Sequence, residues 1–195
     1  MSGSRARLKQ IAALVPEGAS VLDVGCSDGW LLAYLRDTKQ VDGRGIEIDP
    51  DRVAVAVAQG LSVLQGDAMH DLGSFPSQSV DYAVLSEALQ TMHRPAKVLQ
   101  ELVRSCRRAI VAFPNFGFWQ VRTSLMFGGR MPVTDNLSAS WYETENIHFC
   151  TIADFLALAQ ELGLTIERET YFAAEKPVRL WPNLRADHAL FVLHR

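Results

Sequence analysis

The sequence predicts an α/β fold built on a mostly parallel sheet with helices on both faces. Short apolar segments alternate with helical patterns through the first two thirds of the chain, as in parallel sheets. A glycine-bearing turn follows the first apolar segment, and acidic residues follow the next two. Because strand ends of such a sheet form the ligand crevice, a binding site is expected there.

Each expected element has a local signal. Asp49 before Pro50 is typical of a helix N-cap, and Thr151 with Asp154 marks the start of a helix that Gly163 ends. The segment 175–185 is expected to be a polar loop. Seven strands are expected near 20–25, 43–48, 61–65, 80–85, 107–113, 164–172 and 186–193, and helices near 29–37, 50–59, 95–104 and 151–162.

Composition predicts a single globular domain over residues 1–195, with 48% hydrophobic and 21% charged residues. A net charge of −3 gives no electrostatic footprint for nucleic acid, and Arg5, Arg7 and Lys9 are expected on a solvated helix face. No apolar run approaches the roughly 18 residues of a membrane span. Three widely spaced cysteines form no metal or disulfide pattern. We therefore expect a cytoplasmic protein without metal, membrane or nucleic-acid partners.

The turn between Gly25 and Gly29 points to a nucleotide-like cofactor. A dinucleotide fingerprint needs G-x-G-x-x-G, but Ser27 and Trp30 replace its second and third glycines. Asp28 would also repel a pyrophosphate, whereas a zwitterionic amino-acid moiety tolerates a carboxylate. The turn resembles motif I of class I S-adenosylmethionine (SAM) methyltransferases, and it departs from that motif at Ser27. This departure matters only if the position requires positive φ, where serine is strained.

Two later acids extend the resemblance. Glu47 lies 18 residues after Gly29, where a carboxylate can accept hydrogen bonds from a ribose diol. Asp67 follows the third strand, and in the methyltransferase family an acid here accepts from the adenine amino group. Capping of the next helix is the alternative role of each acid, and Cys26 could equally be a small packed residue. The expected site for SAM or S-adenosylhomocysteine (SAH) comprises Asp23, Gly25, Cys26, Ser27, Gly29, Glu47, Ile48, Asp67, Ala68 and Ser86.

The segment 114–149, here called the aromatic insert, interrupts the alternation after the fifth strand. Together with Phe113 it carries eight of the seventeen Phe, Trp and Tyr residues of the chain. A short helix is expected at 120–126, and the remainder is expected to be loop. A connection of this length is usually a lid or a binding surface. The alternative is a satellite core beneath a loop.

No catalytic constellation is evident in the sequence. Methyl transfer to nitrogen or oxygen often needs a general base, but no Asn-Pro-Pro-Tyr or Asp-Pro-Pro-Tyr motif follows the fourth strand. For His148, a loop or core role is an equal alternative. The candidate bases are Glu87, His93, Tyr142, Glu143 and His148.

Three long signatures narrow the resemblance to one family. Residues 111–119 (VAFPNFGFW), 128–134 (GGRMPVT) and 141–148 (WYETENIH) resemble the MetW family of methionine-biosynthesis proteins. The match also includes Leu85-Ser86 and Leu89-Gln90, and it covers roughly residues 15–175. This resemblance implies a Rossmann-like class I SAM-methyltransferase fold.

The resemblance also implies a function. MetW proteins act beside homoserine O-acyltransferase, either an acetyl- or a succinyltransferase. A SAM-shaped pocket in such a protein suggests a sensor, with the aromatic insert as a contact surface. The alternative is a SAM-dependent methyltransferase that acts on a small molecule, with the insert as its lid.

Overall fold

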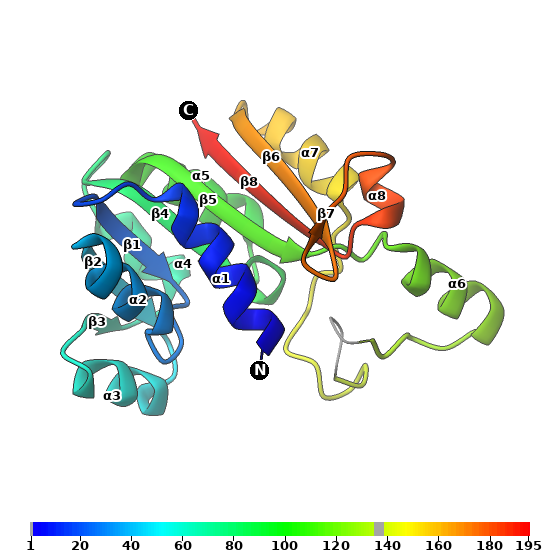
Figure 1. The fold of residues 1–195 in the computed structure, drawn as a ribbon, viewed down its shortest axis with the longest axis horizontal. Coiled ribbons are helices and arrows are strands. Elements are labelled where there is room, and N and C mark those ends of the chain that lie inside the picture. The colour runs from blue at the N-terminus through cyan, green and yellow to red at the C-terminus, as the bar shows by residue number, and fades with distance from the viewer. Residues whose placement is uncertain (1, 135–138) are drawn as a thin grey trace.

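The computed structural model describes residues 2–134 and 139–195 as an α/β fold around an eight-stranded sheet (Figure 1). The strand order is β3-β2-β1-β4-β5-β8-β6-β7. The first five strands are parallel, and β8 is antiparallel to both of its neighbours, as expected of the closing hairpin. The strands are β1 (Ser20–Val24), β2 (Asp42–Glu47), β3 (Ser62–Gln65), β4 (Val80–Ser86), β5 (Cys106–Pro114), β6 (Thr165–Ala173), β7 (Lys176–Pro177) and β8 (His188–His194).

The expectation of seven strands was wrong by one short strand. Lys176 and Pro177 pair with the end of β6 across a two-residue turn, Ala174-Glu175. Both turn residues have positive φ, 46° and 68°, as in a type I′ hairpin turn. Such turns usually carry Asn-Gly or a similar pair, so Ala-Glu gave no hairpin signal. The polar segment 175–185 therefore holds a strand and a short helix instead of a plain loop.

The helices agree with the sequence pattern where it was strong. The four long helices expected between residues 29 and 162 are confirmed, and the short one expected at 120–126 is α6. Two 3₁₀ helices, η1 (Leu72–Ser74) and η2 (Leu89–Thr91), follow α4 and β4. The α-helices are α1 (Ser2–Leu14), α2 (Trp30–Lys39), α3 (Pro50–Ala58), α4 (Ala68–Asp71), α5 (Pro95–Ser105), α6 (Trp119–Gly128), α7 (Ile152–Glu161) and α8 (Pro182–Arg185).

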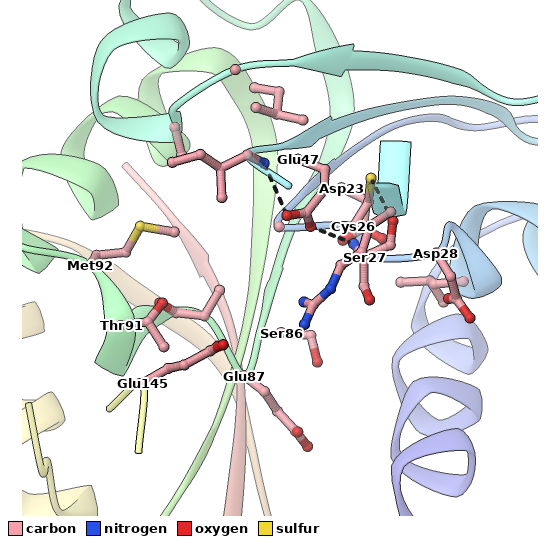
Figure 2. A pocket seen from close by; sticks show the side chains of 18 of the residues that line it. Asp23, Cys26, Ser27, Asp28, Glu47, Ser86, Glu87, Thr91, Met92 and Glu145 are labelled. Atoms are coloured by element: carbon pink, nitrogen blue, oxygen red, sulfur yellow. Dashed lines mark hydrogen bonds between the residues drawn. The ribbon is translucent and has the colours of Figure 1, made fainter. Parts of the chain in front are cut away.

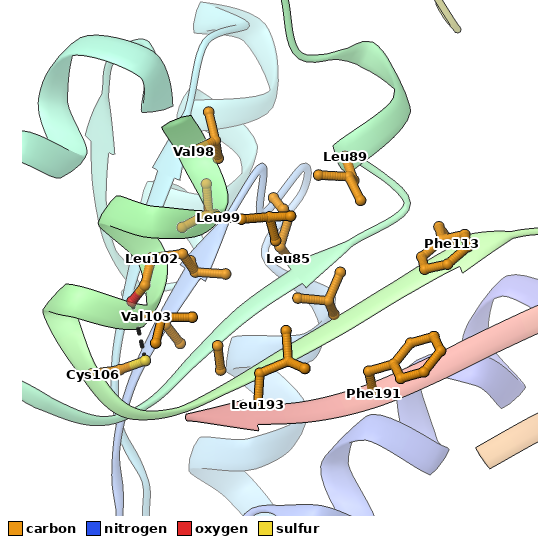
Figure 3. Packing of buried hydrophobic residues seen from close by; sticks show 14 of the residues in the cluster. Leu85, Leu89, Val98, Leu99, Leu102, Val103, Cys106, Phe113, Phe191 and Leu193 are labelled. Atoms are coloured by element: carbon orange, nitrogen blue, oxygen red, sulfur yellow. Dashed lines mark hydrogen bonds between the residues drawn. The ribbon is translucent and has the colours of Figure 1, made fainter. Parts of the chain in front are cut away.

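Two hydrophobic layers hold the sheet between its helices. Successive strand residues point to opposite faces, so neighbours such as Val84 and Leu85 belong to different clusters. One cluster joins α1, α2 and α3 to the sheet, and the other joins α5 and α7 to it. Figure 3 shows α5 packed over the second face, with Leu99 and Leu102 turned toward the strands. This double cover confirms the expected layer arrangement.

The aromatic insert leaves the sheet at the end of β5. Its helix α6 extends away from the strands, and an irregular segment then returns to α7 (Figure 1). Asn115 fixes its base. Its Nδ2 donates to the carbonyls of Asn183 and Ala186, and its Oδ1 accepts from Gly117 N and Ile152 N. Insert residues 135–138 lie outside the described residues.

Candidate functional site

A cavity of about 650 Å³ lies at the carboxyl ends of β1 to β4 (Figure 2). Its size is within the range of small-molecule sites, roughly 300–1,000 Å³. The strand order switches direction between β1 and β4, and ligands bind at such switch points in open α/β sheets. We call this space the crevice cavity. Nine of the ten expected cofactor residues line it, namely Asp23, Gly25, Cys26, Ser27, Glu47, Ile48, Asp67, Ala68 and Ser86.

The glycine turn is held in a left-handed backbone conformation. Gly25, Ser27 and Gly29 have φ values of 73°, 52° and 77°. Ser27 thus adopts the conformation in which a serine is strained. The N–H groups of Gly25 and Cys26 donate to Ile46 O at 2.8 and 3.2 Å, which fastens the turn to β2.

Gly29 does not line the crevice cavity, although it was expected to do so. A Cβ at this position would collide with the side chain of Leu61 and lie 3.1 Å from the Cβ of Ala56. Its positive φ also starts α2. Gly29 therefore serves helix entry and close packing.

The carboxylate of Glu47 joins the turn to the end of β2. It is only 5% exposed. Its Oε2 accepts from Ser27 N at 2.8 Å, and its Oε1 accepts from Ile48 N and Asp49 N at 3.0 Å each (Figure 2). An ionised carboxylate has about four acceptor positions, so one position remains for a donor in the cavity.

Asp23 is the least solvated acid of the crevice cavity. It is 4% exposed near the end of β1, and its side chain makes no hydrogen bond or ion pair within residues 2–134 and 139–195. Burial, assisted by the charge of Glu47, raises the pKa of Asp23 to about 7. An acid in this state is stabilised by a cation or a hydrogen-bond donor that enters the cavity.

Asp67 caps a helix and lines the crevice cavity at once. Its Oδ1 accepts from Met69 N at 2.8 Å, so the capping alternative is confirmed for this residue. Asp49 caps α3 as expected, accepting from Asp51 N at 2.9 Å. The second carboxylate oxygen of Asp67, Oδ2, does not take part in the capping hydrogen bond and lies 3.9 Å from His70 Nε2.

Glu87 belongs to a charge network that the sequence did not reveal. Arg7 Nε contacts its Oε1 at 2.6 Å, and the buried His188 places Nε2 3.4 Å from the same oxygen. Burial opposes ionisation of Glu87, but His188 and Arg7 outweigh it and hold the pKa at about 2. Such a carboxylate is a weak general base near neutral pH.

The N-terminal helix contributes to the site. Arg5 and Lys9 are exposed, as expected of a solvated face, whereas Arg7 is partly buried. Arg7 pairs with Glu87, and the guanidinium carbon of Arg5 lies 5.9 Å from the centre of the Trp30 ring. Arg5 and Leu8 both line the crevice cavity. The apolar spacing of Leu8, Ile11 and Ala12 was the available sign that this helix packs on the domain.

The other candidate bases divide into two groups. His93 lines the crevice cavity, whereas His148, Tyr142 and Glu143 do not. The backbone N–H groups of Ile147 and His148 both donate to Gln90 O at 3.0 Å. This contact brings Glu145 into the cavity wall (Figure 2), a placement for which the sequence gave no signal.

Most of the large side chains of the aromatic insert face solvent. Trp141 and Tyr142 are each 71% exposed, and Trp119 is 48% exposed. The satellite-core alternative is therefore wrong for these residues. It holds only locally, where the rings of Phe116 and Phe149 pack with centroids 4.7 Å apart.

Residues 2–134 and 139–195 contain neither a metal-binding cluster nor a membrane-spanning helix. No group of three or more His, Cys, Asp or Glu side chains there is arranged to hold a metal ion. Among the same residues, no helix combines the length and apolarity needed to cross a membrane.

Relatives connect this geometry with methionine biosynthesis. The bifunctional methionine biosynthesis protein MetXA/MetW of Rhodopirellula baltica is 32% identical over 200 residues, which cover 96% of this chain and 32% of that protein. The chain thus spans about a third of the length of this relative. The demethylmenaquinone methyltransferase of Bacillus licheniformis is 28% identical over 169 residues, or 77% of this chain and 72% of that enzyme.

The fold has close counterparts among solved structures. A SAM-dependent methyltransferase from Archaeoglobus fulgidus superposes with a TM-score of 0.74 at 13% identity, over 98% of this chain and 93% of that one. This similarity shows the class I SAM-methyltransferase fold. The family described as methionine biosynthesis protein MetW matches residues 5–193. Because that match spans nearly the whole chain, the chain belongs to the MetW family of methionine-biosynthesis proteins.

Proposed function

We propose that the protein binds SAM or SAH in the crevice cavity and acts as a partner of homoserine O-acyltransferase. The observation that carries this proposal is the relative in which a MetW part is joined to a MetXA part in one polypeptide. MetX is the homoserine acyltransferase. Fusion gives two modules a permanently high effective concentration. In this chain, non-covalent association would replace the covalent link.

The charge of the crevice cavity supports the choice of ligand. Six carboxylates line it against two guanidinium groups, those of Arg5 and Arg52. A pyrophosphate would be repelled there, whereas a sulfonium and an ammonium would be attracted. The remaining acceptor position of Glu47 suits a ribose diol, and Asp23 would hold the cationic amino-acid end. When bound, SAM would supply an activated methyl group.

The exposed face of the aromatic insert supports the choice of partner surface. Trp, Tyr, Met and Arg are enriched in interface cores and hot spots. Large apolar side chains that are exposed together usually mark an interaction site. Exposed Trp119, Trp141 and Tyr142 fit this description. They lie on the segment whose end, at Glu145, touches the crevice cavity.

The state of the candidate bases favours a partner role over independent catalysis. Arg7 and His188 balance the charge of Glu87 and hold its pKa at about 2, so it is a poor proton acceptor. Of the other candidate bases, His93 lines the cavity, whereas Tyr142, Glu143 and His148 do not.

Calorimetry with SAM and SAH tests the ligand. Glu47→Ala should weaken binding by roughly 1–3 kcal/mol through lost charge-assisted hydrogen bonds. Asp42→Ala, an exposed β2 acid outside the cavity, is the control. If neither SAM nor SAH binds the folded protein, this half of the proposal is refuted.

Co-purification tests the partner. A homoserine O-acyltransferase from the same source should elute with this protein and should gain activity in its presence. Independent elution, together with unchanged acyltransferase activity at every ratio of the two proteins, would contradict the second half.

A second candidate function, small-molecule methyl transfer, is favoured by the 28% identity to a demethylmenaquinone methyltransferase. It requires turnover of SAM to SAH with a defined acceptor. His93→Ala should abolish that turnover if His93 is its base. Turnover that survives in the absence of any acyltransferase would make this candidate the better one.

A further inference from the structure

Residues 144–149, here called the strap, bring the aromatic insert to the crevice cavity. Glu145 of the strap lines the cavity, and Figure 2 shows its side chain turned into the space from the side of Thr91, across from Asp23. Glu145 is exposed to solvent, so a molecule that fills the cavity would change its surroundings. Such a molecule therefore meets the strap as part of its binding wall.

Two backbone hydrogen bonds dock the strap on η2. The N–H groups of Ile147 and His148 both donate to Gln90 O at 3.0 Å. Gln90 is 6% exposed, and its Nε2 donates to Glu87 O at 2.9 Å, so it joins the strap to a residue of the cavity lining. The strap residues belong to neither a helix nor a strand. The position of the strap therefore depends on a few local contacts, and such segments open at a low cost in free energy.

The chain directly before the strap carries the aromatic pair, Trp141 and Tyr142. The pair stands on a turn in which Thr144 N donates to Ser140 O at 3.0 Å. Its two rings meet edge to face, with centroids 5.6 Å apart, and both side chains are exposed. Tyr142 and Glu145 are three residues apart, so their Cα atoms are separated by at most about 11 Å. A partner on the aromatic pair and a ligand in the cavity would thus act on one short element.

We infer that the strap couples the two sites of the proposed function, so that a ligand in the crevice cavity and a partner on the aromatic pair strengthen each other's binding. The inference rests on that function and deepens it, because it states how the site is regulated. Each binding event holds the strap in its docked position against Gln90. The conformational entropy of the strap is then lost once for the two events instead of twice. By linkage, the resulting gain in affinity is the same for the ligand and for the partner.

Hydrogen exchange measured by mass spectrometry tests the effect of the ligand on the strap. In the protein alone, saturating SAM should slow exchange of the Ile147 and His148 amides about fivefold or more, because the released strap becomes rarer. The amides of α6 are the control, since this helix belongs to the same insert but does not line the cavity. Their exchange should change less.

Calorimetry tests the coupling itself. SAM should bind the preformed complex with homoserine O-acyltransferase about fivefold or more tightly than it binds the protein alone. Saturating SAM should in turn tighten the binding of the acyltransferase by the same factor, because coupling is reciprocal.

Variants of the insert assign the coupling to the strap. Glu145→Ala removes the side chain by which the strap meets the cavity, so SAM should no longer protect the strap amides and the coupling should disappear. Glu143→Ala removes an acid two residues away that does not line the cavity, and it should keep both effects. Ile147→Pro deletes one of the two N–H donors to Gln90 O. It is an independent variant with the same expected loss of coupling.

Equal or weaker binding of SAM by the complex, or exchange of the strap amides that SAM leaves unchanged, would overturn the inference and leave the proposed function standing. Coupling that survives in both Glu145→Ala and Ile147→Pro would also overturn it, because the link would then run outside the strap. If neither SAM nor SAH binds, or if the acyltransferase does not associate, the proposed function itself fails. The two failures are therefore distinguishable.

Discussion

Around the crevice cavity, polar groups converge on an enclosed space, whereas in the aromatic insert large apolar groups face water. Asp23 and Glu47 are 4% and 5% exposed, while Trp141 and Tyr142 are each 71% exposed. Both arrangements are costly for an isolated chain. In the proposed function, a small cationic ligand would relieve the first and a macromolecular partner the second. The two regions meet where Glu145 of the insert enters the cavity wall.

The largest expected effect comes from breaking the base that supports the insert. Asn115→Ala removes four hydrogen bonds in a buried location and leaves backbone groups of Gly117, Ile152 and Ala186 without their partner. Because buried unsatisfied groups carry a desolvation penalty, we expect a loss of about 3 kcal/mol or more in the free energy of unfolding. Chemical denaturation measures it, with the exposed Gln120→Ala as control. A loss below about 1 kcal/mol would mean that the insert is not held through Asn115.

The next effect concerns the exposed aromatic residues. Trp141→Ala and Trp119→Ala should each weaken association with the acyltransferase by about 2 kcal/mol, a typical hot-spot value. The SAM affinity and the unfolding free energy should stay within about 0.5 kcal/mol of wild type. Surface plasmon resonance measures the first, and calorimetry and denaturation the others. Unchanged association in both variants would assign the partner surface elsewhere.

The sequence predicted the crevice cavity better than the insert, for physical reasons. Strand periodicity and the spacing of Gly25, Glu47 and Asp67 are local signals. They predicted the parallel strands, and nine of the ten expected site residues line the cavity. Arg7 and His188, in contrast, meet Glu87 only through tertiary packing across 80 or more residues. Glu145 reaches the cavity because two N–H groups bond to Gln90 O, a contact without a residue pattern.

A smaller effect should appear in the pH dependence of stability. The pKa of Glu87 is lowered from 4.5 to about 2, so its contribution is present above pH 4.5 and is lost as the pH falls toward 2. The pKa of His188 is raised above 6.5, because contacts with Asp187 and Glu87 outweigh burial. Its contribution is present below pH 6.5 and is lost as the pH rises through that higher pKa.

Glu87→Gln should remove the dependence that comes from Glu87 and weaken that of His188, which keeps its contact with Asp187. The side chain of Glu87 is 37% exposed, so solvent screening limits the expected loss at pH 6 to about 1 kcal/mol. Denaturation at pH 3, 6 and 8 measures it. Glu167→Gln, which breaks the exposed pair with Arg108, is the matched control and should change stability by less. Parallel pH profiles of wild type and Glu87→Gln would show that this network does not contribute.

The smallest effect tests whether the glycine turn is strained for the sake of the cavity. Ser27 has a φ of 52°, and its N–H bond to Glu47 would persist in Ser27→Gly. Relief of the left-handed conformation, about 1–2 kcal/mol, is partly offset by the flexibility of glycine in the unfolded chain, about 0.5–1 kcal/mol. We therefore expect a net gain of about 0.5 kcal/mol in the free energy of unfolding, with SAM affinity equal or improved. Gly25→Ala is the opposite control, because its φ of 73° and an Ala88 Cβ only 3.2 Å away both oppose a side chain. A Ser27→Gly variant that is less stable and binds SAM more weakly would instead mean that the serine hydroxyl itself contributes to the cavity.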